Sequence, residues 1–113
     1  MSYLFNSYVA IIGDIIKSKD IRDRNDVQCR LKNILDEINI KYHKDIASRF
    51  MITLGDEFQG LLNCGQNAMN IVNEIELQMY PIKIRFGIGV GEITTDINYS
   101  MPIGADGPAY HNA

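Results

Sequence analysis

The order of hydrophobic and polar residues along the chain predicts four β-strands. Residues 8–15 are a continuous apolar run rich in β-branched side chains, which is typical of a central strand covered on at least one face. Residues 49–54 and 58–62 indicate two shorter strands, and the three residues between them have the spacing of a tight hairpin. From Ile82 onward, apolar residues alternate with polar residues and glycines, which predicts a last strand. The apolar residues Ile82, Ile84, Phe86, Ile88 and Val90 are expected on one face of this strand.

Two segments between these strands have the spacing of amphipathic helices. The first is expected to begin with a cap at Asn25 or Asp26 and to end near Tyr42. For the second, Asn63 is the expected cap and Pro81 prevents its continuation. The two apolar stripes are interpreted as core faces, and they comprise Val27, Leu31, Ile34, Leu35 and Ile38 in the first helix and Ala68, Ile71, Val72, Ile75 and Met79 in the second.

The resulting order, βαββαβ, predicts an α+β fold of the ferredoxin-like type, with two helices on one face of an antiparallel sheet. The chain has 113 residues, of which 46% are hydrophobic, and this suffices for a single domain over 1–113. In this topology the third strand lies between the first and the second and runs antiparallel to the first. The end of the first strand therefore meets the start of the third.

This topology brings three acidic residues to one end of the sheet. Asp14 ends the first strand, and Asp56 and Glu57 form the hairpin tip in the sequence LGDEFQG. Such carboxylates suit Mg²⁺ or Mn²⁺, because these ions bind through a few oxygens while phosphates and waters fill the other positions. The alternative is that Asp56 and Glu57 merely occupy a solvated turn, where Asp is a favoured residue. Turn chemistry does not explain Asp14, so the metal site is favoured.

Charge and cysteine content restrict the partners and the compartment. The 14 acidic and 11 basic residues give a net charge of −3, so we expect no direct nucleic-acid binding and no binding to an anionic membrane surface. No apolar run reaches the roughly 20 residues of a membrane span, and the start of the chain has no secretory signal pattern. Cys29 and Cys64 form no CxxC pair, which argues against a zinc site or a disulfide framework. A cytoplasmic location is therefore predicted.

Four stretches of the sequence together resemble the SatD family of bacterial proteins. They are GDIIKSKDI (13–21), LGDEFQG (54–60), RFGIGVGEI (85–93) and GADGPAYHNA (104–113). The first and third also resemble strand motifs of class III nucleotidyl cyclases, and GDEF is similar to the GGDEF signature of diguanylate cyclases. The resemblance implies a cyclase-like palm core. Because members of the family are longer, it also implies that this chain is the N-terminal part of a longer protein.

The resemblance also implies a set of metal ligands. Asp14 and Asp56 match the two metal-bridging acids of the cyclases, and the Ile15 carbonyl would be an additional ligand. Glu57 matches the fourth letter of GGDEF. The implied cofactor is Mg²⁺ or Mn²⁺.

Further roles implied by the resemblance concern the nucleotide. The backbone at Ile16, Lys17 and Ser18 matches the turn that wraps the phosphates of a nucleoside triphosphate, with a plain strand-to-helix loop as the alternative. Asn112 matches the segment of the transition-state asparagine. The purine-reading lysine of many cyclases falls at Ile52, so base selection differs or is absent.

Three kinds of function follow from these patterns. The first is a metal-dependent nucleotidyl transferase or cyclase, and the second is a sensory or regulatory domain that binds a nucleoside triphosphate without turnover. The third is a catalytically inactive structural or dimerisation domain of a protein that resembles a transcription regulator. Cyclase-like cores pair head to tail, so a homodimer is expected. Nucleotide binding is favoured over the structural role, and the sequence does not separate the first two functions.

Overall fold

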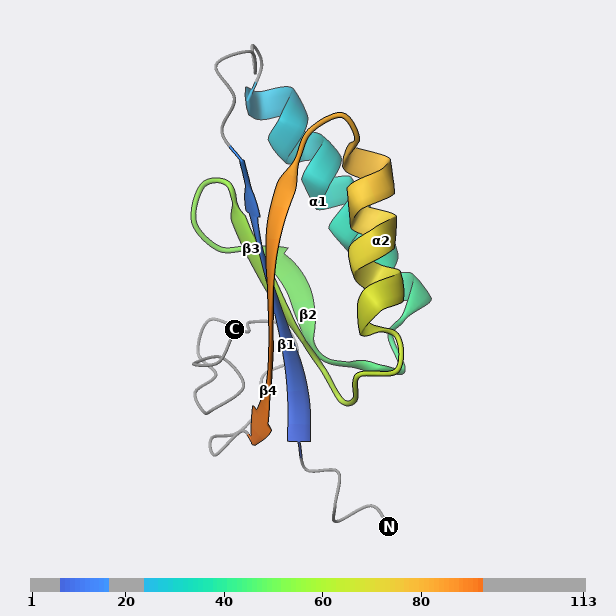
Figure 1. Cartoon of the computed structure of the whole chain (residues 1–113). Helices are drawn as coiled ribbons and strands as arrows, with labels where there is room; N and C mark the ends of the chain where they lie inside the picture. Colours follow the sequence, from blue (N-terminus) through green and yellow to red (C-terminus); the bar gives the residue numbers. More distant parts are fainter. Residues whose placement is uncertain (1–6, 17–23, 93–113) are drawn as a thin grey trace.

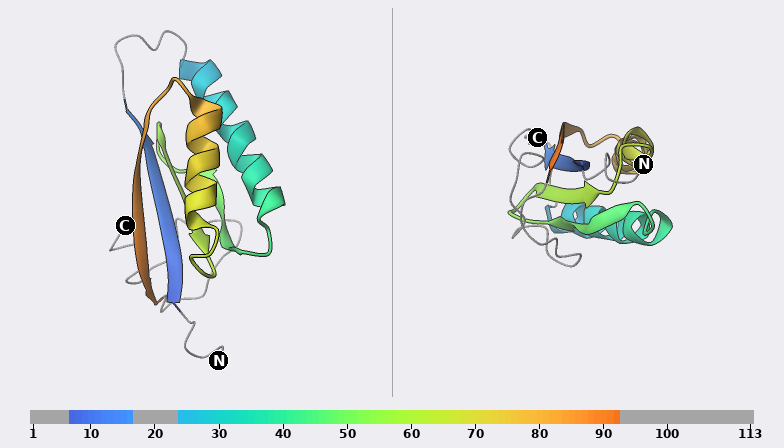
Figure 2. Two further views of the ribbon diagram at one scale, coloured as in Figure 1. Left: turned by 45° about the vertical axis from the view of Figure 1, so that its right-hand side comes forward. Right: turned by 90° about the horizontal axis from the view of Figure 1, so that it is seen from below.

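The structure is a computed structural model that describes residues 7–16 and 24–92. It contains four strands and two helices in the predicted order (Figure 1). Their bounds are Ser7–Ile15 for β1, Arg24–Lys41 for α1, Ile46–Ile52 for β2, Glu57–Leu62 for β3, Ala68–Met79 for α2 and Ile84–Glu92 for β4. The two helices lie on one face of the sheet (Figure 2). The predicted α+β, ferredoxin-like fold is therefore confirmed.

The sheet has the strand order β2-β3-β1-β4, and every neighbouring pair of strands is antiparallel. The central strand β1 pairs with β3 from Val9 opposite Leu62 to Asp14 opposite Glu57. On its other side β1 pairs with β4 along its whole length. The prediction that the third strand lies between the first and the second is confirmed, and so is the meeting of the end of β1 with the start of β3.

A single apolar core fills the space between the helices and the sheet. It is built from alternate residues of the strands together with the stripes predicted for the two helices, because each element presents its apolar positions to the same side. The fully buried large side chains of this core include Ile11, Leu31, Leu35, Ile38, Phe50, Phe58, Ile71, Ile75 and Met79.

Two aromatic rings of the core lie over glycines of a neighbouring strand. Phe58 of β3 is directly opposite Gly13 of β1, and a Cβ atom added to Gly13 would fall among the ring atoms of Phe58. A Cβ atom at Gly60 would collide in the same way with the ring of Phe50 in β2. Both rings are fully buried and cannot move aside without disturbing the core. These glycines are required for packing.

Some boundaries differ from the sequence-based expectation. β2 begins at Ile46 and not at residue 49. The sequence pattern missed this start because Ser48, a polar residue, is buried between Ile46 and Phe50 and interrupts the apolar alternation. The predicted cap at Asn63 is wrong, since α2 begins at Ala68. The side chain of Asn63 instead donates a hydrogen bond to the Lys44 carbonyl at 3.3 Å.

The first helix also starts earlier than expected, at Arg24, so that Asn25 and Asp26 lie inside it. In β4 the predicted apolar face is covered only in part: Ile84 and Phe86 pack against the core, whereas Ile88 and Val90 are 40% and 57% exposed. Figure 1 shows the reason: the end of β4 extends past the start of α2, so the helix does not cover it. Alternation alone could not show where the covering helix begins.

The free edge of β2 is covered by one side chain of α1. The Asn39 amide donates to the Phe50 carbonyl at 2.9 Å and accepts from the Phe50 N–H at 2.7 Å. It thereby makes the two bonds that a further strand would make at this residue. An unpaired edge is a site for association with other chains, so Asn39 both stabilises this edge and blocks it.

The helices are also joined where α1 ends. Lys41 pairs with Glu74 of α2, and the Tyr42 hydroxyl donates to the same carboxylate at 3.0 Å. The hydrogen bond to Glu74 raises the pKa of the Lys41 ammonium. Burial, followed by the hydrogen bond to Glu74, raises the pKa of the Tyr42 phenol. Because both folded-state pKa values are raised, this contribution to stability is present at neutral pH and is lost as the pH rises through the alkaline range.

We predict that Gly13→Ala destabilises the fold by about 1–3 kcal/mol, because the new methyl group would overpack the ring of Phe58. Urea unfolding followed by circular dichroism measures the change. Gly65→Ala is the control, since the nearest heavy atom to its added Cβ lies 3.5 Å away, which is an ordinary contact. Equal stability of the two variants would show that the ring is not held over Gly13.

We also predict that Asn39→Ala lowers the free energy of unfolding by about 1–3 kcal/mol, because it removes both partners of the Phe50 backbone groups. Asn33→Ala is the matched control: the same substitution at an exposed position of the same helix. Thermal unfolding of both variants provides the comparison. A cost at Asn33 as large as that at Asn39 would contradict the proposed role of the amide at the sheet edge.

Candidate functional site

Two of the predicted acidic residues lie directly opposite each other on neighbouring strands. Asp14 of β1 pairs with Glu57 of β3, and the Ile15 N–H donates to the Asp56 carbonyl at 3.0 Å. This bond identifies Asp14 and Glu57 as a non-hydrogen-bonded pair, in which the side chains stand closest, with Cα atoms about 4.5 Å apart. Their neighbours Ile15 and Phe58 point into the core, so both acids face the side of the sheet away from the helices.

The charges around this pair are incompletely balanced. Arg85 of β4 is opposite Asp14 on the other side of β1, but its exposed side chain forms no ion pair with it. Within residues 7–16 and 24–92, neither Asp14 nor Glu57 has a cationic partner within 4 Å. Both acids are half-buried. Like charges directly opposite each other destabilise a sheet, so this pair costs free energy unless a cation joins it.

The hairpin tip is held from within and from α1. The Thr53 N–H donates to the Glu57 carbonyl at 2.8 Å, and the Glu57 N–H donates to the Leu54 carbonyl at 3.0 Å. Gly55 has a positive φ of 58°, a conformation that glycine adopts without strain. The Gln28 side chain of α1 donates to the Gly55 carbonyl at 3.1 Å. The predicted hairpin is confirmed, and it fixes the position of the tip beside the end of β1.

One backbone oxygen at this end has no donor in the ladder. A continued ladder would have the Asp56 N–H donate to the Ile15 carbonyl, as the Ile15 N–H already donates to Asp56. That second bond is not formed, and among the described residues the Ile15 carbonyl has no other hydrogen-bond donor, although Ile15 is buried. The oxygen belongs to the residue that the cyclase resemblance names as an additional metal ligand.

The donor set fits a hard divalent cation in chemistry. It consists of the paired carboxylates, the half-buried Asp56 and the open Ile15 carbonyl, which are all oxygen ligands. In the part of the chain that the structure describes, however, no three side chains of ligating type are grouped closely enough to hold an ion. The backbone oxygen would thus have to complete a site that the side chains alone do not form.

The remaining predicted site residues are only partly within the described ranges. Ile16 is exposed, and its N–H donates to the Lys83 carbonyl at 2.9 Å, so this group is already paired with β4. Lys17, Ser18 and Asn112 lie outside the described residues.

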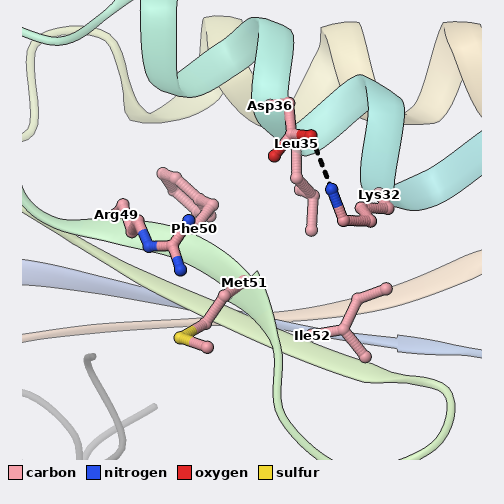
Figure 3. A pocket seen from close by; sticks show the side chains of 7 residues that line it. All are labelled: Lys32, Leu35, Asp36, Arg49, Phe50, Met51 and Ile52. Carbon is pink, nitrogen blue, oxygen red and sulfur yellow. Dashed lines mark hydrogen bonds and ion pairs between the residues drawn. The ribbon is translucent and has the colours of Figure 1, made fainter. Parts of the chain in front are cut away.

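Ile52, the position of the purine-reading lysine in many cyclases, packs partly against the core. It also lines a pocket between α1 and β2 (Figure 3). Across this pocket Lys32 and Asp36 form an ion pair at 2.9 Å along α1. The pocket is therefore lined on its α1 side by two charges that already pair with each other, and Ile52 offers no polar group to a base.

A second pocket lies at the same end of the sheet as the acids. It is lined by Ile16 at the end of β1, by Lys83 before β4 and by Glu76 and Tyr80 at the end of α2. The sequence analysis did not single out Glu76 or Tyr80. The sequence did contain a signal for Tyr80. It is an aromatic residue directly before Pro81, where the helix must stop, so it lies beyond the core face of the helix.

Comparisons with known proteins place this architecture in one structural class. The guanylyl cyclase domain of a rhodopsin fusion protein from the aquatic fungus Blastocladiella emersonii superposes with a TM-score of 0.57 and 16% identity, covering 95% of this chain and 82% of that one. The catalytic core of a rhodopsin-guanylyl cyclase gives 0.54 and 17%, covering 96% and 70%. The guanylate cyclase domain from Catenaria anguillulae, solved in complex with GTP, gives 0.50 and 15%, covering 92% and 76%. The chain thus has a nucleotidyl cyclase-like fold.

The family is shown by sequence. The profile of the SatD family matches residues 8–113, and the chain belongs to this family. A search of curated proteins finds no significant match. In the described ranges no helix is both long and apolar enough to cross a membrane.

We predict that Glu57→Gln increases the free energy of unfolding by about 0.2–1 kcal/mol in metal-free buffer, because it removes the repulsion from Asp14. Urea unfolding in the presence of EDTA measures this gain. Glu37→Gln, the same change at an exposed position of α1, should leave stability unchanged. A loss of stability in Glu57→Gln would mean that the carboxylate makes a favourable contact in the folded chain.

Proposed function

We propose that this chain binds a nucleoside triphosphate together with Mg²⁺ or Mn²⁺ at the end of β1. The observation that carries the proposal is the pairing of Asp14 with Glu57 next to the open carbonyl of Ile15. Two half-buried carboxylates that have no cationic partner among residues 7–16 and 24–92 attract a divalent cation, and the triphosphate would supply further oxygens to it. The nucleotidyl cyclase-like fold supports this reading, since one solved relative of the fold carries GTP.

The proposed ligands have distinct roles. Asp14 and Asp56 would hold the cation, Glu57 would add charge beside Asp14, and the Ile15 carbonyl would supply a neutral oxygen. Bound there, a divalent cation neutralises phosphate charge and polarises the phosphorus–oxygen bonds. The backbone from Ile16 onward, including Lys17 and Ser18, would contact the phosphates. We propose that this binding is part of a regulatory or nucleotidyl-transfer function in a cytoplasmic homodimer. Asn112 would then be a catalytic residue of the transfer reaction.

A second function is favoured by one observation. No group of three ligating side chains is assembled within residues 7–16 and 24–92. This is what a catalytically inactive structural or dimerisation domain would show, because it has no need of a cation. The two functions make opposite predictions for nucleotide binding, and a titration separates them.

We predict that the chain binds GTP or ATP in the presence of Mn²⁺ and that Asp14→Asn or Asp56→Ala weakens this binding at least about tenfold. Contacts to a charged group are worth about 1.5–3 kcal/mol, and about 1.4 kcal/mol corresponds to a factor of ten. Isothermal titration calorimetry measures the affinity, and circular dichroism checks that the variants fold.

Glu37→Gln is the control for this titration, because it removes a carboxylate of α1 that lies outside the site. Its affinity should equal that of the unmodified chain. Metal-dependent binding that survives in Asp14→Asn would place the nucleotide elsewhere. No binding of any nucleotide to the folded chain would favour the structural function.

A further inference from the structure

The pocket at the end of α2 adjoins the proposed phosphate site without being part of it. Ile16 lies two residues beyond Asp14, which is about 7 Å along β1. Its N–H donates to the carbonyl of Lys83, so the end of β1 is joined to the residue before β4, and both of these residues line the pocket. Figure 1 shows the end of α2 at the same end of the molecule as the end of β1 and the start of β4. Asp14 faces away from the helices, whereas Glu76 and Tyr80 belong to α2 and its C-terminal turn. A ligand that reaches both sites would therefore pass over the end of the sheet at Ile16 and Lys83 and span at least about 10 Å.

The aromatic residue of the pocket is exposed but held on a fixed backbone. Tyr80 is 76% exposed. Its backbone is nevertheless fixed, because its N–H donates to the Glu76 carbonyl at 3.0 Å. Arg30 of α1 donates from Nη2 to the Gln78 carbonyl and, at 3.4 Å, to the Tyr80 carbonyl. The turn is thus bonded to both helices while the ring remains accessible. Because the backbone of this turn is already ordered, a flat ligand that stacks on the ring has to order only the side chain of Tyr80.

Two opposite charges complete the pocket. Lys83 and Glu76 are both exposed and both line it. In the described part of the chain neither forms an ion pair. Lys83 is the nearer of the two to the proposed phosphate site, because its carbonyl accepts the hydrogen bond from Ile16. Glu76 is farther away, in the last turn of α2, four residues before Tyr80. The pocket therefore combines a cation toward the phosphates, an aromatic surface and a carboxylate farther away.

We infer that this pocket binds the guanine base of the triphosphate, with Tyr80 stacking on the ring and Glu76 accepting its hydrogen bonds. This inference rests on the proposed function. Bases stack on aromatic side chains, and a carboxylate is an acceptor that matches the adjacent N1–H and N2–H groups of guanine. Adenine presents only its N6 amino group on that edge and has an acceptor at N1, which a carboxylate repels. Base recognition thus takes place at the end of α2 and not at Ile52, which has no polar group to offer.

The inference is tested with three ligands in the presence of Mn²⁺: GTP, ATP and inorganic tripolyphosphate. We expect Tyr80→Ala to weaken GTP binding about tenfold, because stacking of a base on an aromatic side chain contributes on that order. Tripolyphosphate has no base, so its affinity should be unchanged. Tyr80→Phe keeps the ring and should retain GTP binding. We expect Glu76→Gln to remove most of the preference for GTP over ATP.

Leu77→Ala is the matched control, because Leu77 is also 76% exposed on α2 but does not line the pocket. An unchanged GTP affinity in Tyr80→Ala, or an equal loss for GTP and tripolyphosphate, would overturn the base subsite while the proposed function stands. An unmodified chain that binds tripolyphosphate as tightly as GTP would also overturn it. If the unmodified chain binds neither ligand, both the proposed function and the subsite fail.

Discussion

The antiparallel pairing of β1 with β3 is the constraint on which the rest of the structure depends. β1 is the central strand, and its alternate residues are buried under the helices while Asp14 faces the opposite side. Because side chains alternate with a period of two, a slip of one residue in this pairing would turn Asp14 into the core and separate it from Glu57. The register that builds the core is thus the same register that builds the candidate site.

Shape complementarity fixes this register. Between β1 and β3 the ring of Phe58 fits over Gly13, one residue before Asp14, and between β2 and β3 the ring of Phe50 fits over Gly60 in the same way. Each ring requires a residue without a side chain directly beside it, so a shifted pairing would produce both a clash and a void. A well-packed strand pair next to the site allows the chain to hold two carboxylates opposite each other, since core packing offsets their repulsion.

The candidate site lies where separate elements end together. The end of β1 brings Asp14 and the hairpin brings Glu57, while the turn after α2 places Tyr80 in the adjoining pocket. Side chains from α1 hold two of these segments: Gln28 bonds the hairpin tip, and Arg30 bonds the turn. Residues at element ends are free to face a ligand because the core needs little from them.

The sequence by itself determined the elements, their order and the meeting of the end of β1 with the start of β3, which sets Asp14 opposite Glu57, because hydrophobic periodicity and chain topology are local or nearly local properties. Only the tertiary structure decided which apolar residues of β4 are covered, since Ile88 and Val90 are exposed where α2 does not reach. It alone revealed the pocket at Tyr80 and the Ile15 carbonyl, which has no hydrogen-bond donor among the described residues. Both features depend on which segments, distant in sequence, end side by side in the folded chain. The spacing of residues along the sequence contains no information about that proximity.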